Sequence, residues 1–358
     1  MQCIMTWFSP AKILGVVLGC VGFSTVVQAA ADNAVILLYH HVSNETPKST
    51  SISPELFAEH MAYLDKHHQV VSLQEAINKL KRKEPLPDKT VVITFDDGYA
   101  NILENGHPIL KRYNFPYTIF INPDAIGSQK NQLTWQQVIA MQKEGVTFAN
   151  HTLDHSHLLN RQQGENDDDW LARVWRNIEQ AEKAIKDKTG QSFRYLAYPF
   201  GEYNQSLAVK LADEGYTGFA QYSGAISSSS DFTTLPRFPA AGNYARLETL
   251  KTKLNSLAMP VKSSSISDPE IKGAKLKENI KVTVNSEDVV LNQLNCFFQG
   301  QAIEREIKHH TFAYTVKEPL PVGRSRVNCT APSKQYKGRY YWYSQPFFVA
   351  NEKGRYPD

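Results

Sequence analysis

Cysteine is scarce in this sequence. There are four in 358 residues, and two of them, Cys3 and Cys20, lie near the N-terminus. The other two, Cys296 and Cys329, belong to no closely spaced cysteine or histidine cluster, which argues against a thiolate metal site. In an exported protein an even pair most simply forms one disulfide, so we expect a bond between Cys296 and Cys329.

Excess charge is also small. The formal net charge is +3, and residues 1–31 hold one lysine and no acid, so their removal would leave +2. Such a balance does not favour nucleic acid or an anionic membrane as a partner. The hydrophobic and charged fractions, 42% and 21%, are ordinary for a folded protein and do not indicate disorder. We therefore expect neutral or weakly charged partners.

The apolar run Ile13–Val27 is shorter than the roughly 18–20 residues of a membrane-spanning helix. Lys12 precedes it and small residues, Ala29–Ala31, follow it, which is the pattern of a cleaved secretory signal. We predict a signal peptide over residues 1–31 and export to the periplasm or the medium. A retained anchor is one alternative, and lipid attachment at Cys20 is another, although Val17–Cys20 fits a lipoprotein cleavage box imperfectly.

Side chains with metal-binding chemistry follow two short apolar runs. Asp96 and Asp97 come after Val91–Ile93, and His151 and His155 come after residues 145–149. Two imidazoles and one carboxylate suit a divalent metal with open positions for water, and the second carboxylate is then free to act as a base. The i, i+4 spacing predicts that both histidines lie on one face of a helical turn. Carboxylates that cap backbone amides, and histidines that pack or cap a helix, are the alternatives.

The motifs Thr-Phe-Asp-Asp-Gly and His-Thr-x-x-His, in this order, resemble those of the polysaccharide deacetylases, carbohydrate esterase family four. Members remove N-acetyl, sometimes O-acetyl, groups from surface and extracellular polysaccharides. The resemblance spans roughly residues 34 to 257. It implies that Asp97, His151 and His155 hold one divalent metal, most often Zn²⁺ with Co²⁺ or Ni²⁺ as alternatives, and that Asp96 is the general base.

Residues 198–201, Tyr-Pro-Phe-Gly, resemble the family's third motif, a groove wall in which the backbone amide of Phe200 helps to hold the oxyanion. Many members have an arginine two residues before this proline, where this chain has Ala197. Arg237 is the best candidate to replace it and to orient Asp96, as in the branch that deacetylates biofilm polysaccharides. A plain surface ion pair is the alternative.

The catalytic acid is harder to place, because no Leu-x-x-His motif precedes the predicted linker. Tyr39-His40-His41-Val42 resembles the Tyr-His-x-Val of the biofilm-polysaccharide branch, which makes His40 the candidate, with a packing histidine as the alternative. Contacts with sugar rings are expected from a further set of residues, each of which fits the core or the rim equally well: Tyr99, Trp135, Pro199, Phe200 and Tyr203.

Alternating strand and helix patterns between residues 34 and 220 predict a parallel sheet with helical crossovers, and residues 167–188 give the clearest helix. The resemblance sharpens this to a distorted (β/α) barrel, often seven-stranded, over residues 32–258. The serine- and proline-rich composition of residues 259–270 indicates a linker. Residues 271–358 have the pattern of a small all-β sandwich, either a scaffold or a sugar-binding module.

We therefore expect an exported, metal-dependent deacetylase of polysaccharides containing N-acetylglucosamine. The resemblance favours a β-1,6-linked polymer; chitin-type oligomers, peptidoglycan and O-acetylated glycans are alternatives. A non-catalytic carbohydrate-binding barrel and a metal phosphoesterase are the other hypotheses, and a monomer is favoured.

Overall fold

The computed structural model describes residues 30–276, 278–285 and 287–357. The predicted signal peptide therefore lies, apart from its last two residues, outside the described chain. Within these ranges, none of the helices combines the length and the hydropathy that crossing a bilayer requires.

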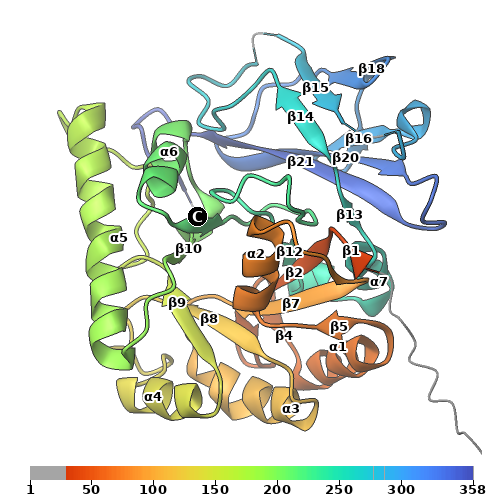
Figure 1. Cartoon of the computed structure of the whole chain (residues 1–358). Coiled ribbons are helices and arrows are strands. Elements are labelled where there is room, and N and C mark those ends of the chain that lie inside the picture. Colours follow the sequence, from red (N-terminus) through yellow and green to blue (C-terminus); the bar gives the residue numbers. More distant parts are fainter. Residues whose placement is uncertain (1–29, 277, 286, 358) are drawn as a thin grey trace, which may run out of the picture.

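The N-terminal part is built on one parallel sheet whose strands follow the order β11-β10-β9-β8-β7-β2-β12, with β5 also paired to β7. Helices surround it (Figure 1). This is the predicted distorted, seven-stranded (β/α) barrel, and the fold class is confirmed. The strands are β2 (Ala34–Tyr39), β5 (Gln69–Val70), β7 (Thr90–Phe95), β8 (Tyr117–Ile121), β9 (Thr147–Asn150), β10 (Tyr195–Ala197), β11 (Thr217–Phe219) and β12 (Phe238–Pro239).

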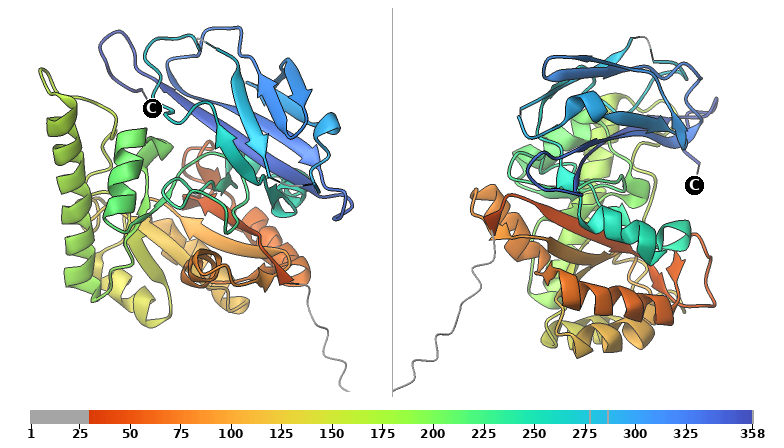
Figure 2. Two further views of the ribbon diagram at one scale, coloured as in Figure 1. Left: turned by 45° about the horizontal axis from the view of Figure 1, so that its top comes forward. Right: turned by 90° about the vertical axis from the view of Figure 1, so that its right-hand side faces the viewer.

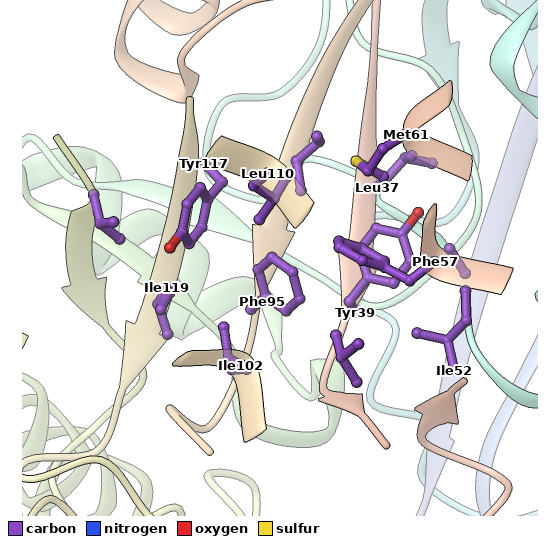
Figure 3. Packing of buried hydrophobic residues seen from close by; sticks show 14 of the residues in the cluster. Leu37, Tyr39, Ile52, Phe57, Met61, Phe95, Ile102, Leu110, Tyr117 and Ile119 are labelled. Atoms are coloured by element: carbon purple, nitrogen blue, oxygen red, sulfur yellow. The ribbon is translucent and has the colours of Figure 1, made fainter. Parts of the chain in front are cut away.

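The two central strands are buried on both faces. All six residues of β2 and all six of β7 are buried, as expected for continuous apolar runs in a parallel sheet. Leu37, Tyr39 and Phe95 pack with Phe57 and Met61 of the first helix on one face (Figure 3). Burial on both faces fixes the strands firmly, so the residues just beyond their carboxyl ends are held in place.

The helices begin and end where the sequence signals them. Ser53 and Thr134 accept backbone hydrogen bonds at the starts of α1 and α4, and Gly190, in a left-handed conformation, ends α5, as caps of these types do. The predicted helix over 167–188 is α5. The helices are α1 (Pro54–His67), α2 (Leu73–Lys81), α3 (His107–Arg112), α4 (Trp135–Lys143), α5 (Asp167–Thr189), α6 (Gln205–Asp213) and α7 (Leu247–Leu254).

The C-terminal part has two facing sheets, in the orders β13-β21-β20-β16-β17 and β14-β15-β19-β18, around an apolar core of their own. The predicted disulfide between Cys296 and Cys329 is confirmed, and it joins paired positions of β16 and β20. The strands are β13 (Leu257–Ala258), β14 (Val261–Ser264), β15 (Ile280–Val284), β16 (Asn295–Phe298), β17 (Gln301–Ala302), β18 (Arg305–Lys308), β19 (Thr311–Tyr314), β20 (Gly323–Pro332) and β21 (Tyr340–Val349).

The expected linker, residues 259–270, is wrong for part of its length. Val261–Ser264 form β14, which pairs with β15, because backbone pairing overrides the serine-rich composition that is typical of a connection. The division of the chain into a barrel and a β-sandwich at this point stays a prediction.

The long strands β20 and β21 lie between the rest of the sandwich and the barrel (Figures 1 and 2). The ring of Trp342 on β21 packs edge-on against Phe238 of β12, with centroids 5.1 Å apart, and the hydroxyl of Ser344 donates to the carbonyl of Ser223. The sandwich thus rests directly on the barrel through one face of this hairpin.

Candidate metal centre and cleft

Asp97, His151 and His155 converge at the carboxyl ends of two parallel strands that lie on either side of β8. Asp97 follows β7 and the histidines follow β9, and one ligand atom from each lies within 4.8 Å of the other two. Asp97 Oδ1 is 3.2 Å from His151 Nε2 and 3.3 Å from His155 Nε2. Carboxyl ends of strands in α/β folds all open on the same edge of the sheet, which is why residues so distant in sequence meet here.

The predicted helical turn for the two histidines is wrong. Residues 151–155 form a loop, and Thr152 and His155 both have positive φ angles, 68° and 58°. Asn122, at the end of β8, holds the loop by donating to the carbonyls of His151 and Thr152. The loop therefore brings both imidazoles to one point by backbone turns, which a spacing argument does not foresee.

The His151 ring is oriented by a contact from the next strand. Its Nδ1 lies 2.7 Å from the carbonyl oxygen of Ala197, at the end of β10. A carbonyl can only accept, so Nδ1 carries a hydrogen and Nε2 points at Asp97. This is the second contact that commonly fixes a metal-binding histidine, and nothing in the sequence signalled it.

The atoms that face the centre of this cluster lack partners. Asp97 Oδ1 and His151 Nε2 are both buried and make no hydrogen bond, although buried polar atoms are normally satisfied. Burial alone would raise the pKa of Asp97, but the imidazoles of His151 and His155 outweigh it and hold that pKa well below its usual range. A cation between these two atoms, which lie 3.2 Å apart, would satisfy both of them, so the residues fit a divalent metal.

Asp96 lies beside this cluster and is held by Arg237. The two terminal guanidinium nitrogens of Arg237 donate to the two carboxylate oxygens at 2.7 and 2.8 Å, and its Nε donates to the carbonyl of Ala220. Both side chains are fully buried, so this is no surface pair. Burial would raise the pKa of Asp96, but that pKa is lowered, chiefly by the charge of Arg237.

A cavity of about 650 Å³ opens beside the cluster at the carboxyl ends of the barrel strands; we call it the cleft. His40, at the end of β2, lines it together with Asp97 and His155. Burial lowers the pKa of His40, whereas the carboxylates of Asp97 and Asp96 act in the opposite direction. The candidate acid thus lies on the same cavity as two of the metal-ligand candidates.

Of the residues expected to contact sugar, the cleft is lined by Tyr99 and Phe200 but not by Trp135, Pro199 or Tyr203. Tyr203 packs in the interior against Tyr198 and Phe348. Trp135 lies at the start of α4, where Lys188 of α5 covers its ring. The structure therefore gives these three residues no place in the cleft wall.

Phe200 has a left-handed backbone, with φ 56° and ψ 3°. Its ring stacks on His157 at 3.8 Å and meets the edge of His155 at 4.6 Å. From the C-terminal sandwich, which we call the β-domain, Arg324 donates to the carbonyl of Phe200. Arg324 and its neighbour on the cleft, Arg326, were not found from the sequence, because no local motif marks them.

Comparisons with known proteins bear on this arrangement. Residues 83–219 match the sequence model of the polysaccharide deacetylase family. The chain is 30% identical over 206 residues to the putative polysaccharide deacetylase YxkH of Bacillus subtilis, covering 56% of this chain and 69% of that protein. It is 27% identical over 227 residues to the poly-β-1,6-N-acetyl-D-glucosamine N-deacetylase of Staphylococcus epidermidis, covering 58% of this chain and 78% of that one.

Two solved structures share the barrel. The de-N-acetylase from Aggregatibacter actinomycetemcomitans superposes with a TM-score of 0.54 and 24% identity, over 62% of this chain and 100% of that one. IcaB from Ammonifex degensii superposes with a TM-score of 0.55 and 22% identity, over 63% of this chain and 97% of that one. At these identities the likeness establishes the fold alone, and it covers 62% and 63% of this chain.

Proposed function

Because this chain belongs to the polysaccharide deacetylase family, we propose that it is a metal-dependent hydrolase that removes N-acetyl groups from a polysaccharide containing N-acetylglucosamine. The observation that carries the proposal is the cluster of Asp97, His151 and His155 around one point. The ionised Asp96 lies beside this cluster in a buried ion pair with Arg237. A binding protein without catalysis has no need of a second, separately oriented carboxylate next to its metal ligands.

Asp97, His151 and His155 would hold the metal, and a nitrogen-rich set of this kind favours Zn²⁺, with Co²⁺ or Ni²⁺ as alternatives. When bound, such an ion activates a water molecule and polarises the acetamide carbonyl. Asp96 accepts the proton of the attacking water, and Arg237 fixes the direction in which that carboxylate faces. The backbone amide of Phe200 donates to the oxygen that gains negative charge.

The C–N bond of the tetrahedral intermediate then breaks, and the departing nitrogen needs a proton. We assign this to His40 on the basis of its place on the cleft wall. The products are acetate and a glucosamine residue with a free amine. Tyr99 and Phe200, which line the cleft, supply ring surface for the sugar.

A β-1,6-linked polymer is the preferred substrate in this proposal. It is supported by the named activity of the Staphylococcus epidermidis relative and by Arg237 and His40, the two positions that resemble that branch of the family. We also propose that the chain is exported, which the disulfide of the β-domain supports, since such bonds persist in oxidising compartments.

The test is acetate release from a β-1,6-linked N-acetylglucosamine pentamer and from the β-1,4-linked pentamer, with the metal content measured on the same sample. We expect release to stop after chelation and to return with Zn²⁺ or Co²⁺. The Asp96→Asn chain should be inactive with its metal retained, whereas the exposed Asp65→Asn serves as the matched control.

Full release by Asp96→Asn, or by a chelated chain shown to hold no metal, would refute the proposed chemistry. Preference for an O-acetyl ester over both pentamers would move the substrate to O-acetylated glycans. Hydrolysis of a generic phosphate ester but of no acetylated compound would instead favour the phosphoesterase.

A further inference from the structure

The hairpin of β20 and β21 presents two different faces. Val327, Cys329 and Ala331 alternate along β20 and are buried in the core of the sandwich. Side chains at even-numbered positions of β20 point the other way, and two of these, Arg324 and Arg326, lie opposite Phe348 and Pro346 of β21. All four of these last residues line the cleft. The β-domain therefore supplies one wall of the cavity that holds the candidate metal ligands.

This wall is cationic. Arg324 places its guanidinium 5.5 Å from the centre of the Phe200 ring and donates to the Phe200 carbonyl at 2.7 Å, so it is held at the cleft edge. Arg326 is partly buried, and its Nε is a buried donor with no hydrogen-bond partner. An unpaired buried guanidinium N–H is costly, which indicates that a ligand atom belongs beside it.

A third cation, on α7, lies close enough to Arg326 to feel its charge. Lys253, in the last turn of α7, is only 9% exposed, and its Nζ is buried without a hydrogen-bond partner. The ammonium lies 4.7 Å from the ring centre of Tyr244, which itself lines the cleft. Burial lowers the pKa of Lys253 to about 8, and the charge of Arg326 acts in the same direction.

Acidic groups do not balance these charges within the cleft. Among the described residues that line it, Asp97 is the one acid, and a bound metal ion would take up its charge. Asp97 and His155 also line a second cavity, of about 270 Å³, together with Asp124 and Asp154. Cations therefore line the cleft, whereas further carboxylates line the second cavity beside the same cluster.

We propose that Arg324 and Arg326 form a subsite for an anionic group, a carboxylate or a phosphate, carried by the glycan that the cleft binds. The planar fork of a guanidinium matches either group, and an anion there would satisfy the unpaired Nε of Arg326. The inference rests on the proposed function for the identity of the ligand as a glycan. It adds that the preferred chain bears acidic residues or substituents next to the acetylated sugar.

The experiment measures binding without turnover, on the full-length Asp96→Asn chain loaded with Zn²⁺, by titration calorimetry at low salt. The probes are a hyaluronan hexasaccharide, in which N-acetylglucosamine alternates with a carboxylate sugar, chitohexaose as the neutral match, and inorganic phosphate. We expect the acidic hexasaccharide to bind about tenfold more tightly than chitohexaose, because its carboxylate would form a hydrogen-bonded charge pair with the arginines. Added salt should remove most of that difference.

Arg326→Gln tests the assignment, since Arg324→Gln also removes the contact with Phe200 and would disturb the cleft. Arg326→Gln should abolish the tenfold preference, and Arg112→Gln, an exposed arginine of α3, should keep it. A different pattern would assign the subsite to phosphorylated glycans. In that pattern the parent binds both hexasaccharides equally, and phosphate weakens hexasaccharide binding to the parent but not to Arg326→Gln.

Equal affinity for both hexasaccharides with no effect of phosphate would overturn the proposal, as would a preference that survives Arg326→Gln. Acetate release from the neutral pentamers is measured separately and reports on the proposed function alone. If the protein deacetylates neutral oligomers but shows no preference for the anionic hexasaccharide, the subsite proposal fails and the proposed function stands.

Discussion

Replacing Arg237 by methionine should destabilise the barrel strongly. The guanidinium makes two charge-assisted hydrogen bonds with Asp96, at 2.7 and 2.8 Å, and a third with the Ala220 carbonyl at 3.0 Å. Neither side chain of the pair reaches solvent. Arg237→Met keeps most of the volume but leaves a buried carboxylate and a buried carbonyl without partners.

Breaking a buried ion pair by removing one partner costs about 3–5 kcal/mol, because an uncompensated charge stays inside the protein. The same reasoning predicts that the double variant Asp96→Asn/Arg237→Met recovers about 2 kcal/mol or more of that loss, since the charge itself has then gone. The sign of this recovery separates an electrostatic cost from a packing cost, because packing is disturbed equally in both chains.

The measurement is urea unfolding of chelated protein at pH 7, followed by tryptophan fluorescence. Arg112→Met, on the exposed end of α3, controls for the loss of an arginine and should change the free energy of unfolding by less than about 0.5 kcal/mol. If the free energy of unfolding of Arg237→Met lies within about 1 kcal/mol of the parent value, as for an ordinary substitution, the account of this pair is refuted. A double variant less stable than Arg237→Met would refute it too.

Three further substitutions test the contributions of a buried histidine, the disulfide and a glycine with positive φ to the stability of the protein. Burial lowers the pKa of His60 to about 4 from about 6.5 in the unfolded chain, so unfolding takes up a proton between these values. His60 therefore contributes stability that is present above about pH 6.5 and falls by about 3 kcal/mol towards pH 4; urea unfolding of His60→Gln should lack this part of the slope. Replacing Cys296 and Cys329 by alanine opens a loop of 33 residues and should cost about 3–4 kcal/mol by chain entropy, measured by urea unfolding with reduced parent protein as control. Gly201→Ala should reduce the free energy of unfolding by about 2 kcal/mol and so lower the melting temperature, because φ is +72° and the new methyl would stand 2.7 Å from the Gln221 backbone nitrogen. An unchanged melting temperature would contradict this.

Much of the barrel could be predicted because its strands are evident in the sequence. β2 and β7 are continuous apolar runs, buried on both faces, and residues just beyond such strands must share one edge of the sheet. That reasoning brings Asp97 near His151, and the structure does so. It could not give the loop conformation of His155, which depends on backbone angles at Thr152 and on Asn122 of another strand.

The all-β character of the C-terminal part and its disulfide were predicted correctly, but two of its features could not be predicted, for a different reason. β14 is serine-rich and is a strand only because β15 pairs with it, and pairing of this kind is invisible in local composition. Arg324 and Arg326 look like ordinary exposed positions of an alternating strand. Their importance depends on how one domain packs on the other, which no periodicity along β20 encodes.

The contact of β20 and β21 with the barrel separates two sets of residues along the chain. The candidate ligands and the Asp96–Arg237 pair lie between residues 96 and 237, whereas Arg324 and Arg326 of the cleft wall belong to the hairpin. Sequence changes in the hairpin can therefore alter the cleft wall while every side chain of the metal cluster stays as it is.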